Sequence, residues 1–109
     1  MTDFMKIMKQ AKELQGKMAE AQARLDEEEV TGEAGAGLVT VTMTAKGDVR
    51  RLSIDPSIMV PSEVTVVEDL IIAAHNDARR RAEEVQKKIM ADAAGGLQLP
   101  PGMPSPFGG

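Results

Sequence analysis

The chain has no cysteine, tryptophan or tyrosine, and its only aromatic residues among 109 are Phe4 and Phe107. Without thiols it can form neither disulfides nor thiolate metal sites. With so few rings it lacks the stacking platforms that single-stranded nucleic acids require. The lone histidine, His75, offers no pairing of nucleophile, base and acid, and the acidic clusters lack metal-ligand spacing. We therefore expect no enzyme activity, no metal, no cofactor and no small-molecule substrate.

Long apolar runs are also missing. No stretch approaches the ~20 apolar residues of a membrane span, and the N-terminus has no run of signal-peptide length. At 109 residues the chain is expected to form one domain with a small core. These features predict a protein of the cytoplasm that has no membrane partner.

The net charge of −4 is distributed unevenly along the chain. Residues 1–19 carry four lysines against two carboxylates, and residues 78–90 carry five basic residues against two acidic ones. Residues 20–35 hold six carboxylates and one arginine. A local basic surface can bind phosphates even on an acidic molecule, with modest and strongly salt-dependent affinity.

Residues from Thr2 to about Asp26 predict a long amphipathic helix. Its apolar side chains recur at alternating spacings of three and four, as in a heptad seam: Phe4, Ile7, Ala11, Leu14, Met18, Ala21 and Leu25. At ~1.5 Å per residue the helix is roughly 35 Å long. The seam fits either a helix that faces the core or a coiled coil between chains. Both interpretations require a second long helix.

A small antiparallel sheet of two or three strands is expected next, with residues 30–33 as a short first strand. Residues 38–45 alternate apolar side chains with threonines, which is typical of a half-buried strand. A turn at 46–48 and a return over 49–55 complete the hairpin, and Pro56 ends it. Because so small a sheet is marginal alone, it must be covered by the helices or by another copy.

A second long helix is predicted from about Thr65 to Ala94. Thr65 and Glu68 have capping-box spacing, and Gly95-Gly96 should end the helix. Its stripe is rich in alanine at the centre, which allows close packing: Val67, Leu70, Ile71, Ala74, Ala78, Ala82, Val85 and Ile89. At about 45 Å the helix is longer than the sheet can cover. This mismatch predicts a homodimer with projecting helical arms.

The basic residues of both helices form the candidate site. Three consecutive arginines span about 300° of a helix surface, so they cannot all face one core. Guanidinium groups suit bidentate contact with phosphate. In the alternative interpretation they form a solubilising face, in which Arg79 pairs with Glu83 and Arg80 with Glu84. The candidate DNA-binding residues are Lys6, Lys9, Lys12, Lys17, Arg79, Arg80, Arg81, Lys87 and Lys88.

The order of several sequence blocks resembles the YbaB/EbfC family of bacterial nucleoid-associated proteins. The resemblance covers nearly the whole chain and rests on Gly-Ala-Gly-Leu-Val-Thr-Val-Thr at 35–42, Gly47, Ile-Asp-Pro-Ser at 54–57, residues 67–78, 95–97 and 100–102. It implies a homodimer with a central β-layer and arms arranged like tweezers, which binds duplex DNA through basic residues of the two long helices. It also implies a place in the cytoplasm and nucleoid, where such proteins organise the nucleoid, protect DNA and regulate genes.

We therefore predict an intertwined α+β homodimer with one domain at 1–96 and a disordered Pro- and Gly-rich tail at 97–109. The predicted function is binding of double-stranded DNA mainly through phosphate contacts, with a change in DNA conformation. The alternative is a protein-interaction adaptor or chaperone-like dimer whose arms grip another polypeptide, aided by the adaptable Met8, Met18 and Met90. Steep salt dependence would favour DNA.

Overall fold

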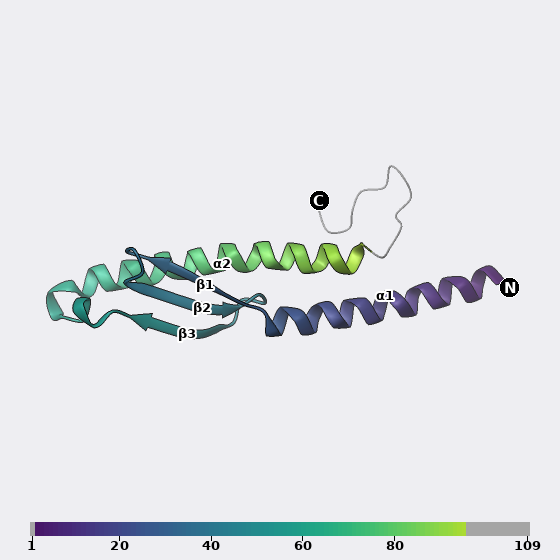
Figure 1. Ribbon diagram of the computed structural model, residues 1–109, viewed down its shortest axis with the longest axis horizontal. Coiled ribbons are helices and arrows are strands. Elements are labelled where there is room, and N and C mark those ends of the chain that lie inside the picture. The colour runs from purple at the N-terminus through teal and green to yellow at the C-terminus, as the bar shows by residue number, and fades with distance from the viewer. Residues whose placement is uncertain (1, 96–109) are drawn as a thin grey trace, which may run out of the picture.

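The computed structural model describes residues 2–95 and consists of a long helix, a three-stranded antiparallel sheet and a second long helix (Figure 1). The elements are α1 (Thr2–Glu27), β1 (Glu29–Ala34), β2 (Val39–Thr44), β3 (Val49–Ile54) and α2 (Val64–Ala94). The predicted α+β class and the order of its elements are confirmed. Gly96 and the predicted tail at 97–109 lie outside the described residues.

The sheet has the order β1-β2-β3, and both pairings are antiparallel. Val41 and Met43 of β2 are buried on one face, as the alternation with threonine predicted. Between Thr42 and Met43 the register with β3 shifts, so Met43 pairs with Val49 while Val41 pairs with Leu52. This bulge keeps Val49 and Leu52 on the same face of the sheet, because residues paired across strands point the same way.

α2 lies across the β1–β2 half of that face (Figure 1). The core of this layer consists of small helix residues against strand residues: Ala74, Ala78 and Ala82 with Val39, Val41 and Met43. The alanines, four residues apart, let the strands approach the helix backbone closely. Gly32 of β1 makes the closest approach, because a Cβ there would lie 2.5 Å from the carbonyl oxygen of Ala74.

The second half of α1 packs antiparallel against the end of α2. Ala21 and Leu25 are buried there with Ile89 and Ala93, so this part of the predicted seam packs within the chain. The first half of α1 extends beyond the end of α2 (Figure 1). Phe4 is consequently 66% exposed, and the seam has no cover in this half within the described residues.

α2 begins at Val64, one residue from the predicted position, but the capping-box prediction is wrong. The N-cap residue is Glu63, and its side chain makes no capping hydrogen bond. A 3₁₀ turn from Pro61 to Glu63 precedes the helix, and the fixed φ of proline already suits a helical start. The end at Ala94 matches the prediction. Neither helix, within the part of the chain described, is apolar enough over a sufficient length to cross a membrane.

Candidate nucleic-acid interface

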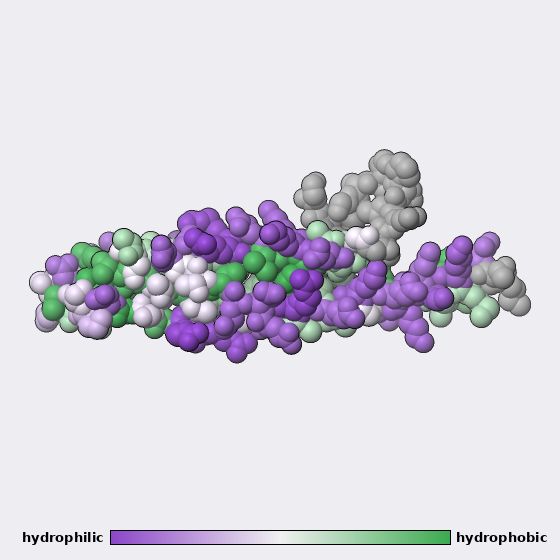
Figure 2. Space-filling view, viewed as in Figure 1, coloured by the Kyte–Doolittle hydropathy of each residue, from purple (hydrophilic) through white to green (hydrophobic). Residues whose placement is uncertain are grey.

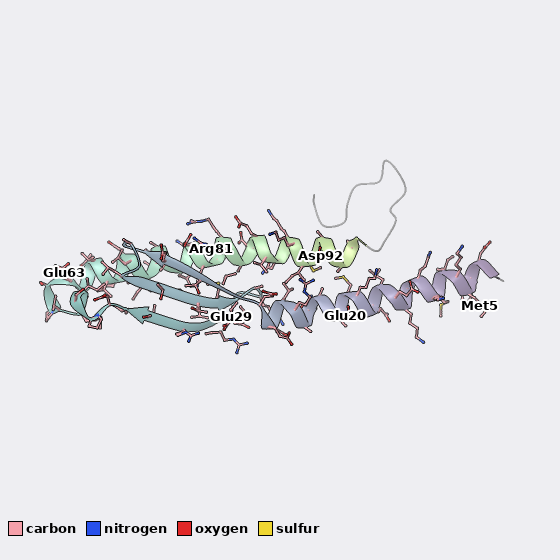
Figure 3. The ribbon with its side chains drawn as sticks, in the orientation of Figure 1. Met5, Glu20, Glu29, Glu63, Arg81 and Asp92 are labelled. Carbon is pink, nitrogen blue, oxygen red and sulfur yellow. The ribbon has the colours of Figure 1, made fainter. Side chains whose placement is uncertain are left out.

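The nine candidate basic residues all lie on the two long helices, and every one except the half-buried Lys17 is exposed. Figure 3 places Arg81 on α2 beside the sheet and Met5 near the free end of α1. The arginine cluster and the first three lysines of α1 therefore lie far apart along the molecule. Within one chain they form two separate basic groups, a separation that the sequence did not predict.

The partners of the arginines agree only in part with the predicted pairs. Arg79 Nε lies 3.7 Å from Glu83 Oε1, as expected for residues four apart on a helix. The predicted pair of Arg80 with Glu84 is wrong. Arg80 Nη2 instead donates to Oδ1 of Asp77 at 3.2 Å, one turn in the opposite direction along the helix.

Asp77 accepts hydrogen bonds from both Arg80 and Arg81, and a third hydrogen bond holds its side chain in place. Its Oδ2 accepts the backbone N–H of Glu33, on the edge strand β1, at 3.0 Å, and also Nε of Arg81 at 3.2 Å. The Asp77 side chain is 20% exposed. The carboxylates of the other ion pairs are 53 to 69% exposed. The hydrogen bond from Glu33, with further contributions from Arg81 and Arg80, holds the pKa of Asp77 below its ordinary value of 3.8.

This lowered pKa predicts an acid-dependent loss of stability. Ionised Asp77 stabilises the fold fully above its unfolded-state pKa of 3.8, and the contribution disappears as pH falls through the lower folded-state pKa. We expect Asp77→Asn to lower the urea midpoint at neutral pH. The gap between variant and wild type should then narrow below pH 3.8, as measured by circular dichroism. A difference in urea midpoint that stays constant below pH 3.8 would show that the charge of the Asp77 carboxylate does not contribute to stability.

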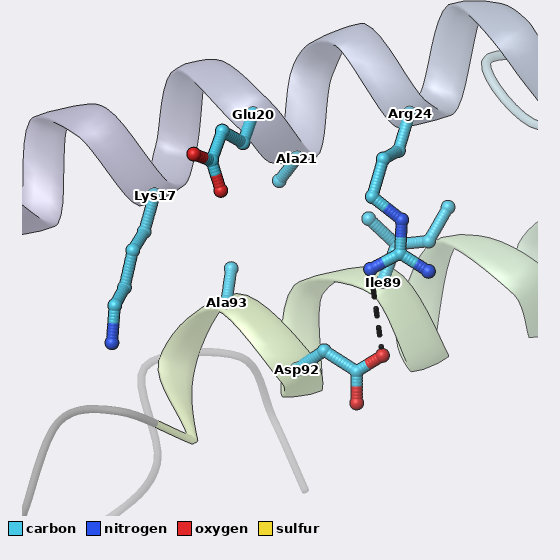
Figure 4. A pocket seen from close by; sticks show the side chains of 7 residues that line it. All are labelled: Lys17, Glu20, Ala21, Arg24, Ile89, Asp92 and Ala93. Atoms are coloured by element: carbon cyan, nitrogen blue, oxygen red, sulfur yellow. Dashed lines mark hydrogen bonds and ion pairs between the residues drawn. The ribbon is translucent and has the colours of Figure 1, made fainter.

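The lysines of α1 fall into two groups. Lys6, Lys9 and Lys12 are exposed and make no ion pair within residues 2–95. Lys17 lines a cleft of about 150 Å³ between α1 and α2, together with Arg24 and Asp92 (Figure 4). Arg24 Nη1 and Asp92 Oδ2 lie 3.5 Å apart in this cleft. Both signs of charge line this cleft, so Lys17 does not lie on a purely basic surface.

An apolar groove lies between β3 and α2, and none of the residues that line it is basic. It has a volume of about 300 Å³ and is lined by Val41, Val49, Leu52, Ile71, Ile72, His75 and Asn76. It exists because α2 covers only β1 and β2, which leaves Val49 51% and Ile72 60% exposed. The half-buried His75 sits at this groove with no acid or nucleophile among its lining residues. Within residues 2–95, no group of histidines and carboxylates could hold a metal ion.

Hydrophobic residues gather at several places on the surface. Figure 2 shows hydrophilic residues over much of both helices, and hydrophobic residues mainly at the end where α2 begins, with further ones at mid-length and on the free half of α1. Met59, Val60 and Val64, where the chain turns into α2, are 43 to 60% exposed. Exposed apolar side chains therefore occur at both ends of the molecule, since Phe4, Met5, Ile7 and Met8 beside the lysines of α1 are 58 to 73% exposed.

Known proteins are similar to this chain in sequence and in fold. The sequence profile of the YbaB/EbfC DNA-binding family matches residues 1–97. A nucleoid-associated protein of Maricaulis maris is 64% identical, covering 98% of this chain and all of its own length, and one of Granulibacter bethesdensis is 52% identical, covering 93% and 94%. An uncharacterized protein of Helicobacter pylori has a crystal structure with a TM-score of 0.70 at 19% identity, covering 82% of this chain and 94% of that one. The chain belongs to the YbaB/EbfC DNA-binding family.

Proposed function

We propose that this protein is a nucleoid-associated homodimer that binds double-stranded DNA mainly through phosphate contacts and alters its conformation. The observation that carries the proposal is the placement of eight exposed lysines and arginines on the two long helices. Membership of a DNA-binding family and the names of its relatives support it. The scarcity of aromatic residues argues against base stacking. Organisation and protection of the nucleoid and regulation of genes follow as its roles in the cytoplasm.

The spacing of the basic residues suits contact with a backbone rather than with base edges. Arg80 and Lys87 are seven residues apart, as are Arg81 and Lys88, so each pair shares one face of α2. The rise within each pair is about 10.5 Å. Basic residues spaced in this way can contact a line of phosphates, and such contacts carry no sequence information by themselves. The acidic stretch from 26 to 29 repels DNA, so affinity should be moderate and steeply salt-dependent.

Dimerisation is proposed to occur through the apolar groove and β3. Within the described residues no strand pairs with the outer edge of β3, and exposed apolar surface of this kind marks interaction sites. None of the residues that line the groove is a lysine, an arginine or a carboxylate. Two copies can therefore bring their groove linings together without repulsion between like charges, while the exposed Arg50 and Arg51 of β3 must lie at the rim of the interface. The dimer would present two sets of arms to one duplex.

Replacing Arg79, Arg80 and Arg81 together by alanine should weaken binding to a duplex by at least about 10-fold at 0.1 M salt, because up to three phosphate contacts are lost. Fluorescence anisotropy across a salt series measures this, and the salt slope should become shallower. The control replaces Arg24 and Lys46 by alanine, because these two basic residues lie outside the nine candidates and outside β3. An equal loss of affinity per charge removed in both variants would reduce the effect to net charge. No binding by the wild type at low salt would refute the proposed function.

The adaptor alternative retains one supporting observation. Phe4, Ile7 and Met8 are 58 to 66% exposed on the free half of α1, which could contact another polypeptide. Met18 and Met90, however, pack against the core between α1 and α2, so they are not available as an adaptable surface. If the affinity of the protein for its partner stays unchanged from low to high salt, the adaptor function is favoured over DNA binding.

A further inference from the structure

The contacts of Asp77 point to a control on the basic surface. We propose that Asp77 is an internal competitor for phosphate, which holds Arg80 and Arg81 in a carboxylate-bound state from which DNA must displace them. The inference rests on the proposed binding of duplex DNA and concerns how the same surface is regulated. In this proposal a single acidic residue, Asp77, sets the affinity for duplex DNA.

The geometry ties both guanidinium groups to one carboxylate. Arg80 Nη2 binds Oδ1 and Arg81 Nε binds Oδ2, each at 3.2 Å, so each arginine uses a different oxygen. Carboxylate and phosphate oxygens are alternative partners for the same N–H donors. A phosphate can reach the N–H groups of either arginine that Asp77 does not use, but it then binds beside a fixed negative charge unless it replaces Asp77 as the acceptor.

Asp77 cannot move away with its partners. Its Oδ2 also accepts the backbone N–H of Glu33 at 3.0 Å, which anchors the carboxylate to β1. The lowered pKa keeps Asp77 ionised across the physiological range, so the competition is permanent. Because the side chain retains 20% exposure, water can solvate the carboxylate once the arginines leave, and displacement remains feasible.

Arg79 provides an internal contrast. Its Nε lies 3.7 Å from Glu83, and both side chains are more than half exposed, so this contact is loose. The contrast lies in the carboxylates, because Glu83 is 57% exposed and Asp77 20%, so a phosphate displaces Glu83 from Arg79 more easily than Asp77 from Arg80 or Arg81. The arrangement keeps affinity low and strongly dependent on salt, which lets the protein redistribute along DNA.

The test uses Asp77→Asn in the full-length protein. The amide oxygen still accepts the Glu33 N–H, while the negative charge that holds the arginines is lost. We expect duplex affinity to rise about threefold to tenfold at 0.1 M salt, with a steeper salt slope, since about one phosphate contact is gained. The matched control is Glu84→Gln, which removes the same charge from the same helix at a residue without an ion pair in residues 2–95. It should change affinity less than about twofold because exposed charges are screened.

A double-mutant cycle makes the inference specific to the two arginines. In a background of Arg80→Ala with Arg81→Ala, the gain from Asp77→Asn should shrink to that of Glu84→Gln. Wild-type binding with steep salt dependence, but equal effects of Asp77→Asn and Glu84→Gln, overturns this inference and leaves the proposed function standing. Absence of wild-type binding at low salt overturns both.

A measurement on the wild type avoids any risk that the variant misfolds. Titration with pyrophosphate, followed through the ¹⁵Nε resonances of the arginines, should move the signal of Arg81 as its Nε exchanges Asp77 for phosphate. A response confined to Arg79, with Arg81 unmoved at saturation, would contradict the competition.

Discussion

Replacing Gly32 by alanine is expected to unfold the protein or to lower its free energy of unfolding by about 3 kcal/mol or more. A Cβ at this position would lie 2.5 Å from the Ala74 carbonyl oxygen and 2.6 Å from the Ala78 Cα, with the Ala78 backbone nitrogen nearer still. These are backbone atoms, so no change of rotamer can relieve the overlap. To make room, β1 must move off α2, which opens the layer that buries both alanines.

Urea unfolding followed by circular dichroism measures the loss, and Gly16→Ala is its matched control. Gly16 lies on the exposed surface of α1, and a Cβ there meets nothing within 4 Å. Alanine is favoured over glycine inside a helix by about 0.5–1 kcal/mol, so this variant should be more stable than the wild type. The same substitution is thus predicted to have opposite signs at the two glycines. A stable Gly32→Ala protein would mean that β1 does not approach the backbone of α2 so closely.

The same contact explains what the sequence could and could not predict. Helix and strand positions follow from local periodicity, so α1, β2 and the alanine stripe of α2 were placed within a residue or two. Gly32 was expected within the short first strand at 30–33, but its close approach to a helix was not predicted. Its role depends on which helix crosses β1, and no spacing within the chain encodes that crossing.

The candidate nucleic-acid interface was also only partly predictable from the sequence. The positions of Arg79 to Arg81 on an exposed helix were predictable, because three consecutive residues cannot share one buried face. The choice of partner was not, because Asp77 is held by a backbone N–H from a strand 44 residues away in sequence. That anchor makes Asp77 a better acceptor for Arg80 than the freely exposed Glu84. Local pair rules therefore succeed for Arg79 and fail for its neighbour.

The groove beside β3 also depends on which strands α2 crosses. Leu52 and Ile54 of β3 pair with Val41 and Val39, so both lie on the apolar face of the sheet. The sequence did not predict that α2 would cover two strands and leave the third open. An apolar face left open in this way on a chain with a small core is the physical reason to expect a second copy.

Replacing Ile72 by glutamate should convert the proposed dimer into a monomer. Ile72 is 60% exposed and lines the groove, so the substitution leaves the chain's own core intact and places two like charges at a two-fold interface. Loss of the second set of arms should lower duplex affinity by about 100-fold, because bivalent attachment is lost. Sedimentation equilibrium gives the mass, and anisotropy gives the affinity.

The control for this prediction is Ile7→Glu, which makes the same chemical change at a residue 62% exposed on the free half of α1. That variant should remain a dimer, because α1 there lies far from the groove (Figure 1). Comparison of the two variants separates dimerisation from the general effect of added negative charge on DNA binding, since each chain gains one carboxylate. If Ile72→Glu stays dimeric while Ile7→Glu dissociates, the subunits join through their arms and not through β3. The surface proposed to bind DNA would then have to be reassigned around α1.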